Sequence, residues 1–105
     1  MTKIKIKNVE YELKYNIKTL FIFERLTDKV FEPTKLFDLH IFFYSCLLAN
    51  NENFTILAND FIEMCDEEPR LFIEFLDFFR SSIAVEKQLD DLNGEEVISD
   101  DKKKD

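Results

Sequence analysis

The spacing of apolar residues changes near residue 16, and this change limits the folds open to the chain. Over residues 3–15, apolar side chains alternate with Lys and Glu, which is the pattern of half-buried strands. We therefore expect a β-hairpin that turns at Asn8 and Val9. Because Val disfavours the positive φ of a tight turn, we expect either a loop of three or more residues or a left-handed Asn8. Since a lone hairpin is marginal in water, it must pack on helices or pair with another molecule.

The rest of the ordered chain carries the signals of four helices. Their expected spans are 17–27, 35–50, 56–65 and 68–86. The expected N-caps of the first three are Asn16, Thr34 and Thr55. The second helix is apolar nearly all round from Leu39 to Ala49, so we expect it to be the most buried element.

These patterns predict a mainly α fold, with an N-terminal β-hairpin (3–15) followed by a bundle of about four helices. Residues 1–88 form the single predicted domain. After Gln88 the apolar residues stand isolated among acids, and such a segment buries too little apolar area to offset the entropy of ordering. Residues 89–105 are therefore predicted to be a disordered, charged tail.

Few residues suited to catalysis or cofactor binding occur in this sequence. The one glycine, Gly94, lies in the tail, so a glycine-rich phosphate loop is excluded. His40, Cys46 and Cys65 lack the spacing of zinc ligands. We expect His40 to be a polar residue near the start of the central helix, and the two cysteines to be free, buried thiols. Since the acids come in adjacent runs typical of solvated segments, we expect no enzyme activity, no cofactor and no metal.

The formal net charge of −8 limits the class of partner. It disfavours DNA, RNA and anionic membranes, which would repel the chain. No apolar run reaches the roughly 20 residues that span a bilayer, and no apolar leader follows Met1. We therefore expect a cytoplasmic protein whose partners are other proteins.

Twelve phenylalanines are more than one small core is expected to need. Five are assigned to the core: Phe21, Phe23, Phe42, Phe43 and Phe61. Four others share one broad arc of the last helix with Leu71 and Leu76: Phe72, Phe75, Phe78 and Phe79. A surplus apolar arc usually marks an interface, so we predict that these four bind a partner or a second copy of the chain. The alternative is that they belong to the core only.

The order of several short segments resembles a known family. The segment Phe23-Glu24-Arg25-Leu26-Thr27-Asp28-Lys29 follows the hairpin, and Phe54-Thr55 and Asp60-Phe61 follow the apolar helix. This arrangement resembles the tail assembly chaperones of long-tailed bacteriophages and related prophages. In that family a Phe-Glu-x-x-Thr-Gly-Lys segment after a small hairpin is common. Asp28 stands where Gly is usual, and Asp also tolerates the left-handed conformation.

The resemblance implies a non-enzymatic, mostly helical chaperone that acts in the host cytoplasm and is absent from the finished virion. Such a protein binds the tape measure protein and the tail tube protein, and keeps them soluble until the tube polymerises. It also implies a longer product made by programmed ribosomal frameshifting, for which Lys102-Lys103-Lys104 could supply an A-rich slip site. Two alternatives stay open. One is a small acidic regulatory or inhibitor protein that mimics nucleic acid, and the other is a minor structural tail component.

Overall fold

The computed structural model describes the backbone of residues 2–97 and the side chains of residues 2–83. It begins with an antiparallel hairpin of β1 (Thr2–Ile6) and β2 (Val9–Leu13), in which Ile4 pairs with Tyr11. The turn has two residues, Lys7 and Asn8, with φ of 51° and 67°. Two successive positive φ values are those of a type I′ turn. Of the two predicted alternatives the structure therefore has the left-handed Asn8, and Val9 begins the second strand.

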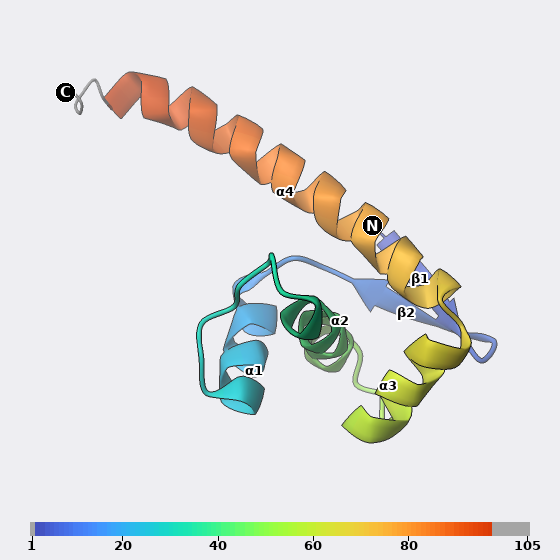
Figure 1. The fold of residues 1–105 in the computed structure, drawn as a ribbon. Coiled ribbons are helices and arrows are strands. Elements are labelled where there is room, and N and C mark those ends of the chain that lie inside the picture. The colour runs from blue at the N-terminus through green and yellow to red at the C-terminus, as the bar shows by residue number, and fades with distance from the viewer. Residues whose placement is uncertain (1, 98–105) are drawn as a thin grey trace.

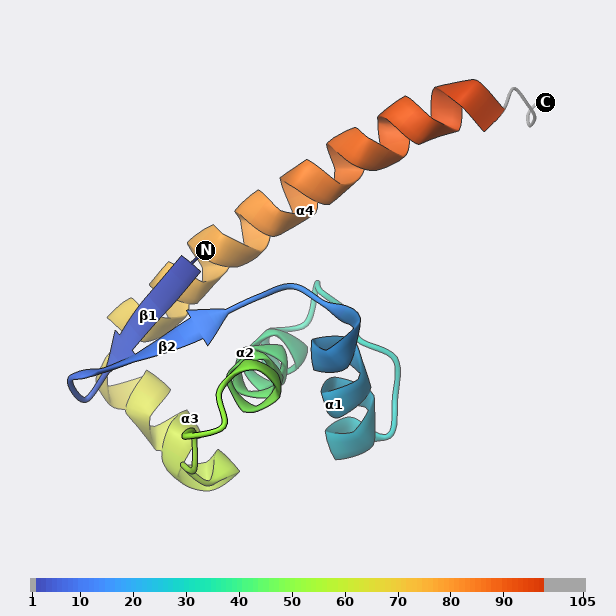
Figure 2. The same cartoon turned by 180° about the vertical axis from the view of Figure 1, so that it is seen from behind.

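Four helices follow the hairpin: α1 (Ile17–Thr27), α2 (Leu36–Asn50), α3 (Ala58–Glu67) and α4 (Arg70–Val97). Figures 1 and 2 show α2 between α1 and α3, with α4 beginning beside β1. The predicted hairpin and four-helix arrangement is confirmed. The helix α4 continues beyond the expected end at residue 86, and its C-terminal half projects away from the other elements (Figure 1). Residues 98–105 of the predicted disordered tail lie outside the described residues.

One face of the hairpin packs in cis on α2 and α4. The Asn51 side chain accepts a hydrogen bond from the Glu12 N–H at 2.8 Å and donates one to the Glu12 carbonyl at 3.0 Å. The Cys46 thiol donates to the Lys14 carbonyl at 3.0 Å. These bonds satisfy backbone groups of β2 and the residue after it with side chains of α2 and its C-cap. The hairpin therefore belongs to the fold of one molecule.

One of the three predicted N-caps is present. Asn16 caps α1, because its Oδ1 accepts a hydrogen bond from the Thr19 N–H at 2.9 Å. The predictions for Thr34 and Thr55 are wrong, since Lys35 and Leu57 occupy the N-cap positions and make no side-chain cap bond.

Tertiary contacts explain why α3 begins later than expected. Phe54 is buried in the core, and the Tyr44 hydroxyl donates to the Ile56 carbonyl at 2.6 Å. These contacts hold the approach to α3 in place, and the chain turns into the helix only after Leu57, which is extended with ψ of 154°.

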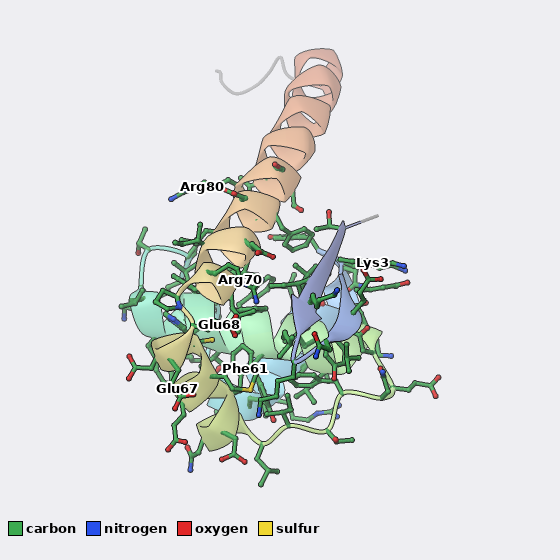
Figure 3. The ribbon with its side chains drawn as sticks, turned by 90° about the vertical axis from the view of Figure 1, so that its right-hand side faces the viewer. Lys3, Phe61, Glu67, Glu68, Arg70 and Arg80 are labelled. Atoms are coloured by element: carbon green, nitrogen blue, oxygen red, sulfur yellow. The ribbon has the colours of Figure 1, made fainter. Side chains whose placement is uncertain are left out.

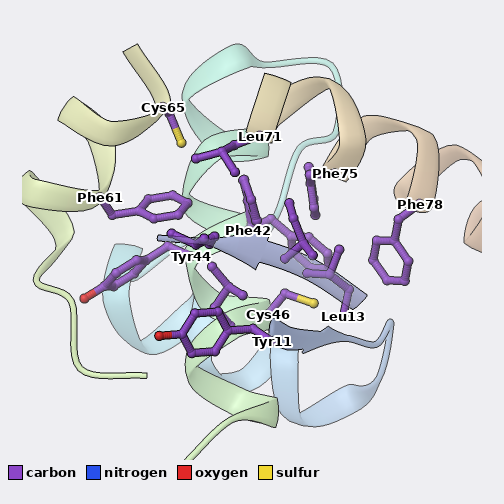
Figure 4. Close-up of a cluster of buried hydrophobic side chains, with 14 of the residues drawn as sticks. Tyr11, Leu13, Phe42, Tyr44, Cys46, Phe61, Cys65, Leu71, Phe75 and Phe78 are labelled. Carbon is purple, nitrogen blue, oxygen red and sulfur yellow. The ribbon is translucent and has the colours of Figure 1, made fainter. Parts of the chain in front are cut away.

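The core surrounds α2, as the sequence predicts. Phe23, Phe42, Phe43 and Phe61 are fully buried, and Figure 4 shows Phe61 and Phe42 among the packed side chains. The expectation for Phe21 is wrong, because 62% of its surface is exposed. Phe21 lies two residues before Phe23, about 200° away around α1, so only one of the two rings can face α2. Cys46 and Cys65 are free and buried, which confirms that prediction.

Candidate partner-binding surface

The four phenylalanines predicted to bind a partner lie mostly in the core. Phe75, Phe78 and Phe79 are buried, and Phe72 is partly buried. The Phe75 ring stacks on Phe43 with centroids 4.6 Å apart, and Figure 4 shows Phe75 and Phe78 facing the packed cluster. The prediction that these four rings form an accessible binding arc is therefore wrong. They pack in the core, which was the alternative. The physical reason is that the hairpin adds an apolar layer beside α2, which increases the interior that aromatic rings can fill.

The segment from Phe23 to Lys29 forms the C-terminal end of α1 and the start of the connection after it. Asp28 is left-handed, with φ of 56° and ψ of 34°, and its N–H donates to the Glu24 carbonyl at 2.7 Å. The Thr27 hydroxyl donates to the Phe23 carbonyl at 2.8 Å. The Asp28 bond satisfies a carbonyl in the last turn of α1, and the Thr27 hydroxyl adds a second hydrogen bond to a carbonyl one turn before it. This segment therefore stops α1 and directs the chain toward α2.

Lys29 then ties the connection to the first turn of α2. Its ammonium pairs with Asp38, whose carboxylate also accepts from the Glu32 N–H at 2.9 Å. Burial of Asp38 raises the pKa of its carboxyl, but the hydrogen bonds from Lys29 and Glu32 outweigh this, and the net pKa is lowered. The hydrogen bond to Asp38 raises the pKa of Lys29. This ion pair fixes the start of α2 relative to α1.

Large apolar side chains are exposed on several elements. They lie mainly on α1 and the connection after it, at the start of α2, and around α3. Among the described residues they are Val9, Ile17, Phe21, Leu26, Val30, Leu36, Phe37, Leu57, Ile62, Ile73 and Ile83. Single exposed apolar residues are normal on protein surfaces, so only a place where several converge indicates binding.

Such a place lies between α2 and α3, and we name it the α2–α3 groove. Leu36, Phe37 and His40 line it from α2, and Ile62, Cys65 and Asp66 line it from α3. Its volume is about 340 Å³, which is near the lower end of ligand-binding clefts.

Aromatic packing supports the groove, and the Cys65 thiol that lines it is a weak nucleophile. The His40 ring stacks parallel to Phe72 with centroids 3.8 Å apart, and its Nδ1 donates to the Leu36 carbonyl at 2.9 Å. Burial raises the pKa of the Cys65 thiol to about 11. Since the thiolate is the nucleophilic form, this thiol is a poor nucleophile near neutral pH. The geometry therefore suits binding of apolar groups.

The helix α3 carries four acidic side chains. Asp60, Glu63, Asp66 and Glu67 are exposed, and the helix has no basic residue. Glu68, just after it, pairs with Arg70 at 2.8 Å, and Figure 3 shows these two residues and Glu67 where α3 gives way to α4. The four acids of α3 itself make no ion pair within the described part of the chain. Lys7 of the hairpin turn lines one pocket with Asp60, Glu63 and Glu67, whereas Asp66 lines the α2–α3 groove.

Across residues 2–83 no three His, Cys, Asp or Glu side chains gather as metal ligands would. No helix in the described part of the chain is both long enough and apolar enough to cross a bilayer. Comparisons with protein-family models, with curated proteins and with solved structures found no match.

The sequence contains a weak signal for the groove. Leu36 and Phe37 occupy the first turn of α2, where polar residues that serve the helix end are common. Ile62 stands among the polar residues of α3. Apolar residues at such positions are often exposed, but only the packing of α2 on α3 brings them to one groove.

Proposed function

We propose that this protein is a non-enzymatic tail assembly chaperone of a long-tailed phage or prophage. In this role it binds the tape measure protein, and the tail tube protein, in the host cytoplasm and keeps them soluble until the tail assembles. The observation that carries the proposal is the conformation of Asp28. It is left-handed at the position where the family commonly has Gly, in a helix-ending segment that otherwise fits the family pattern.

The surface supports a role in binding aggregation-prone proteins. Such a chaperone needs exposed apolar side chains to hold its client, and a net charge that keeps the complex in solution. The chain combines a net charge of −8 with exposed side chains such as Phe21, Phe37 and Leu57.

Co-expression with the client tests the proposal. The tape measure protein from the same gene cluster is produced alone, with this chain, and with an unrelated protein of similar size and charge. We expect the soluble fraction of the tape measure protein to rise only with this chain, and the two to co-purify. The same soluble fraction in all three cultures, with no complex, would show that the proposal is wrong.

Three further measurements separate the proposal from its alternatives. Mass spectrometry of purified particles should not detect the chain, whereas a structural tail component would be present. Sequencing codons 99–105 and the −1 frame beyond them should reveal an A-rich slip site. Mass spectrometry of the expressed products should then find a minor, extended protein.

A further inference from the structure

We infer that the α2–α3 groove is the client-binding site, and that its ligand is an amphipathic helix with apolar anchors on one face and Lys or Arg beside them. The assignment of this ligand to a client rests on the proposed function. The chemistry of the ligand is argued from the groove itself.

The apolar part of the groove is exposed and convergent. Leu36 and Phe37 are 65% and 63% exposed, and Ile62 faces the same space from α3. Covering these side chains removes apolar area from water, which is the main favourable term in protein association. The groove is large enough to receive apolar side chains and too small for a folded domain.

The walls of the groove favour a helical ligand over an extended one. An extended peptide gains most of its affinity by adding a strand to a free sheet edge. Both walls here are helices, α2 and α3, and no strand of the described residues lines the groove, so an extended ligand has no sheet edge to join. Contact is then mainly with side chains, and a helix presents side chains at i, i+3, i+4 and i+7 along one face.

Asp66 selects the polar flank of the ligand. It lines the groove and makes no ion pair in the described part of the chain, whereas Asp60, Glu63 and Glu67 line a separate pocket together with Lys7. Lys or Arg beside the anchors would complement this charge and speed the encounter. A second copy of the chain is a poor occupant, because two chains of charge −8 repel each other.

The groove is preformed in the unbound chain. The Lys29–Asp38 pair holds the first turn of α2, and Phe61 and Met64 anchor α3 in the core. The His40 ring is held against Phe72. A site on rigid elements loses little conformational entropy on binding, so a short helix can bind it measurably.

A designed peptide tests the inference without the client. The probe is a fluorescent peptide of about 18 residues, with Leu at i, i+3, i+4 and i+7 and Lys on the flanks. The comparison peptides carry the same residues in scrambled order, or Glu in place of Lys. Fluorescence anisotropy with the full chain should give saturable binding for the first peptide alone.

Two exposed phenylalanines give a matched pair of variants. Phe37→Ser removes an anchor of the groove, and we expect it to weaken binding of the Leu/Lys peptide roughly tenfold. Phe21→Ser removes an equally exposed ring from α1, and we expect a change of less than about twofold. Asp66→Lys should weaken binding at low salt and less at high salt. Circular dichroism and urea unfolding verify that each variant is folded.

Three outcomes would overturn the inference. The first is an equal loss of peptide affinity in Phe21→Ser and Phe37→Ser. The second is binding of the scrambled peptide as tight as that of the Leu/Lys peptide. The third is that the wild-type chain is a dimer and Phe37→Ser makes it a monomer. The co-expression assay separates this inference from the proposed function. If Phe37→Ser and the wild type solubilise the tape measure protein equally, the groove is the wrong site and the function stands. If the peptide needs Phe37 but the tape measure protein stays insoluble, the groove stands and the function is wrong.

Discussion

At the scale of single residues, Asp28 must adopt the left-handed conformation that Gly adopts most easily. Its left-handed conformation ends α1, and a residue with a Cβ atom pays a steric cost there that Gly does not. We predict that Asp28→Gly stabilises the fold by about 0.5–1 kcal/mol, measured as the free energy of unfolding in urea.

Asp77→Gly is the comparison for this variant, because Asp77 is also exposed but lies inside α4. Gly in a helix interior is expected to destabilise by about 1 kcal/mol. If both variants destabilise the chain equally, the left-handed conformation at residue 28 does not favour Gly over Asp.

The Lys29–Asp38 ion pair should make the free energy of unfolding depend on pH. The pKa of Asp38 is lowered in the fold from its ordinary value of 3.8, so the unfolded chain binds a proton more readily. The pair therefore stabilises the fold above pH about 4, and this contribution is lost as the pH falls toward the lowered pKa. We expect Asp38→Asn to destabilise the chain at pH 7, and the difference from wild type to shrink as the pH falls to about 3.

Urea unfolding at several pH values measures this effect. Asp60→Asn removes an exposed carboxylate from α3 and serves as the control. A stability difference between wild type and Asp38→Asn that stays constant from pH 7 to pH 3 would show that the ion pair is not responsible.

At the scale of elements, α4 illustrates how a helix face acquires its role. The same aromatic arc would bind a partner if it faced solvent, yet it covers α2 and the hairpin. Phe75 contacts Phe42 and Phe43 of α2, and Phe79 lies 6.0 Å from Tyr15 between the centroids of the rings. The helix α4 therefore contributes its first turns to the core.

Paired truncations of aromatic rings test this assignment. Phe75→Ala leaves a cavity among fully buried rings, and we expect it to cost about 3–5 kcal/mol of unfolding free energy. Phe37→Ala removes a ring that is mostly exposed, and we expect a change within about 0.5 kcal/mol. Urea denaturation measures both. If both variants lose similarly little unfolding free energy, the aromatic arc of α4 is not buried in the core as described.

At the scale of the whole molecule, the tertiary contacts join the hairpin, the first three helices and the first turns of α4. The hairpin, α1, α2, α3 and the start of α4 pack together, while the rest of α4 projects away from them (Figure 2). We predict that a chain ending at Gln88 unfolds within about 0.5 kcal/mol of the full chain. Denaturant titrations of the two chains measure the difference.

The same truncation addresses the acidic inhibitor alternative. The removed segment is rich in acids, and a nucleic-acid mimic that uses this charge would lose its activity. A chaperone that uses the α2–α3 groove would still solubilise its client. A truncated chain that fails to fold would show that the domain extends beyond residue 88.

Local patterns predicted the elements well and the burial of single faces less well. The hairpin and the span of α1 follow from periodicity and from the cap at Asn16. Thr34 and Thr55 resemble caps in sequence, but the helices begin at Leu36 and Ala58, and for α3 the contacts of Phe54 and Tyr44 hold the preceding chain. The groove was not predicted, because its lining comes from two helices whose contact no local pattern encodes.

The sequence by itself determined the types and order of the elements, because hydrophobic period, turn residues and caps act within a few positions of the chain. Only the tertiary structure decided which apolar side chains are covered. Phe23 and Phe75 are buried while Phe21 and Phe37 are exposed, although all four are the same residue type on helices. The physical reason is that burial depends on what packs across each face, and this is settled only when α1, α2, α4 and the hairpin assemble around one core.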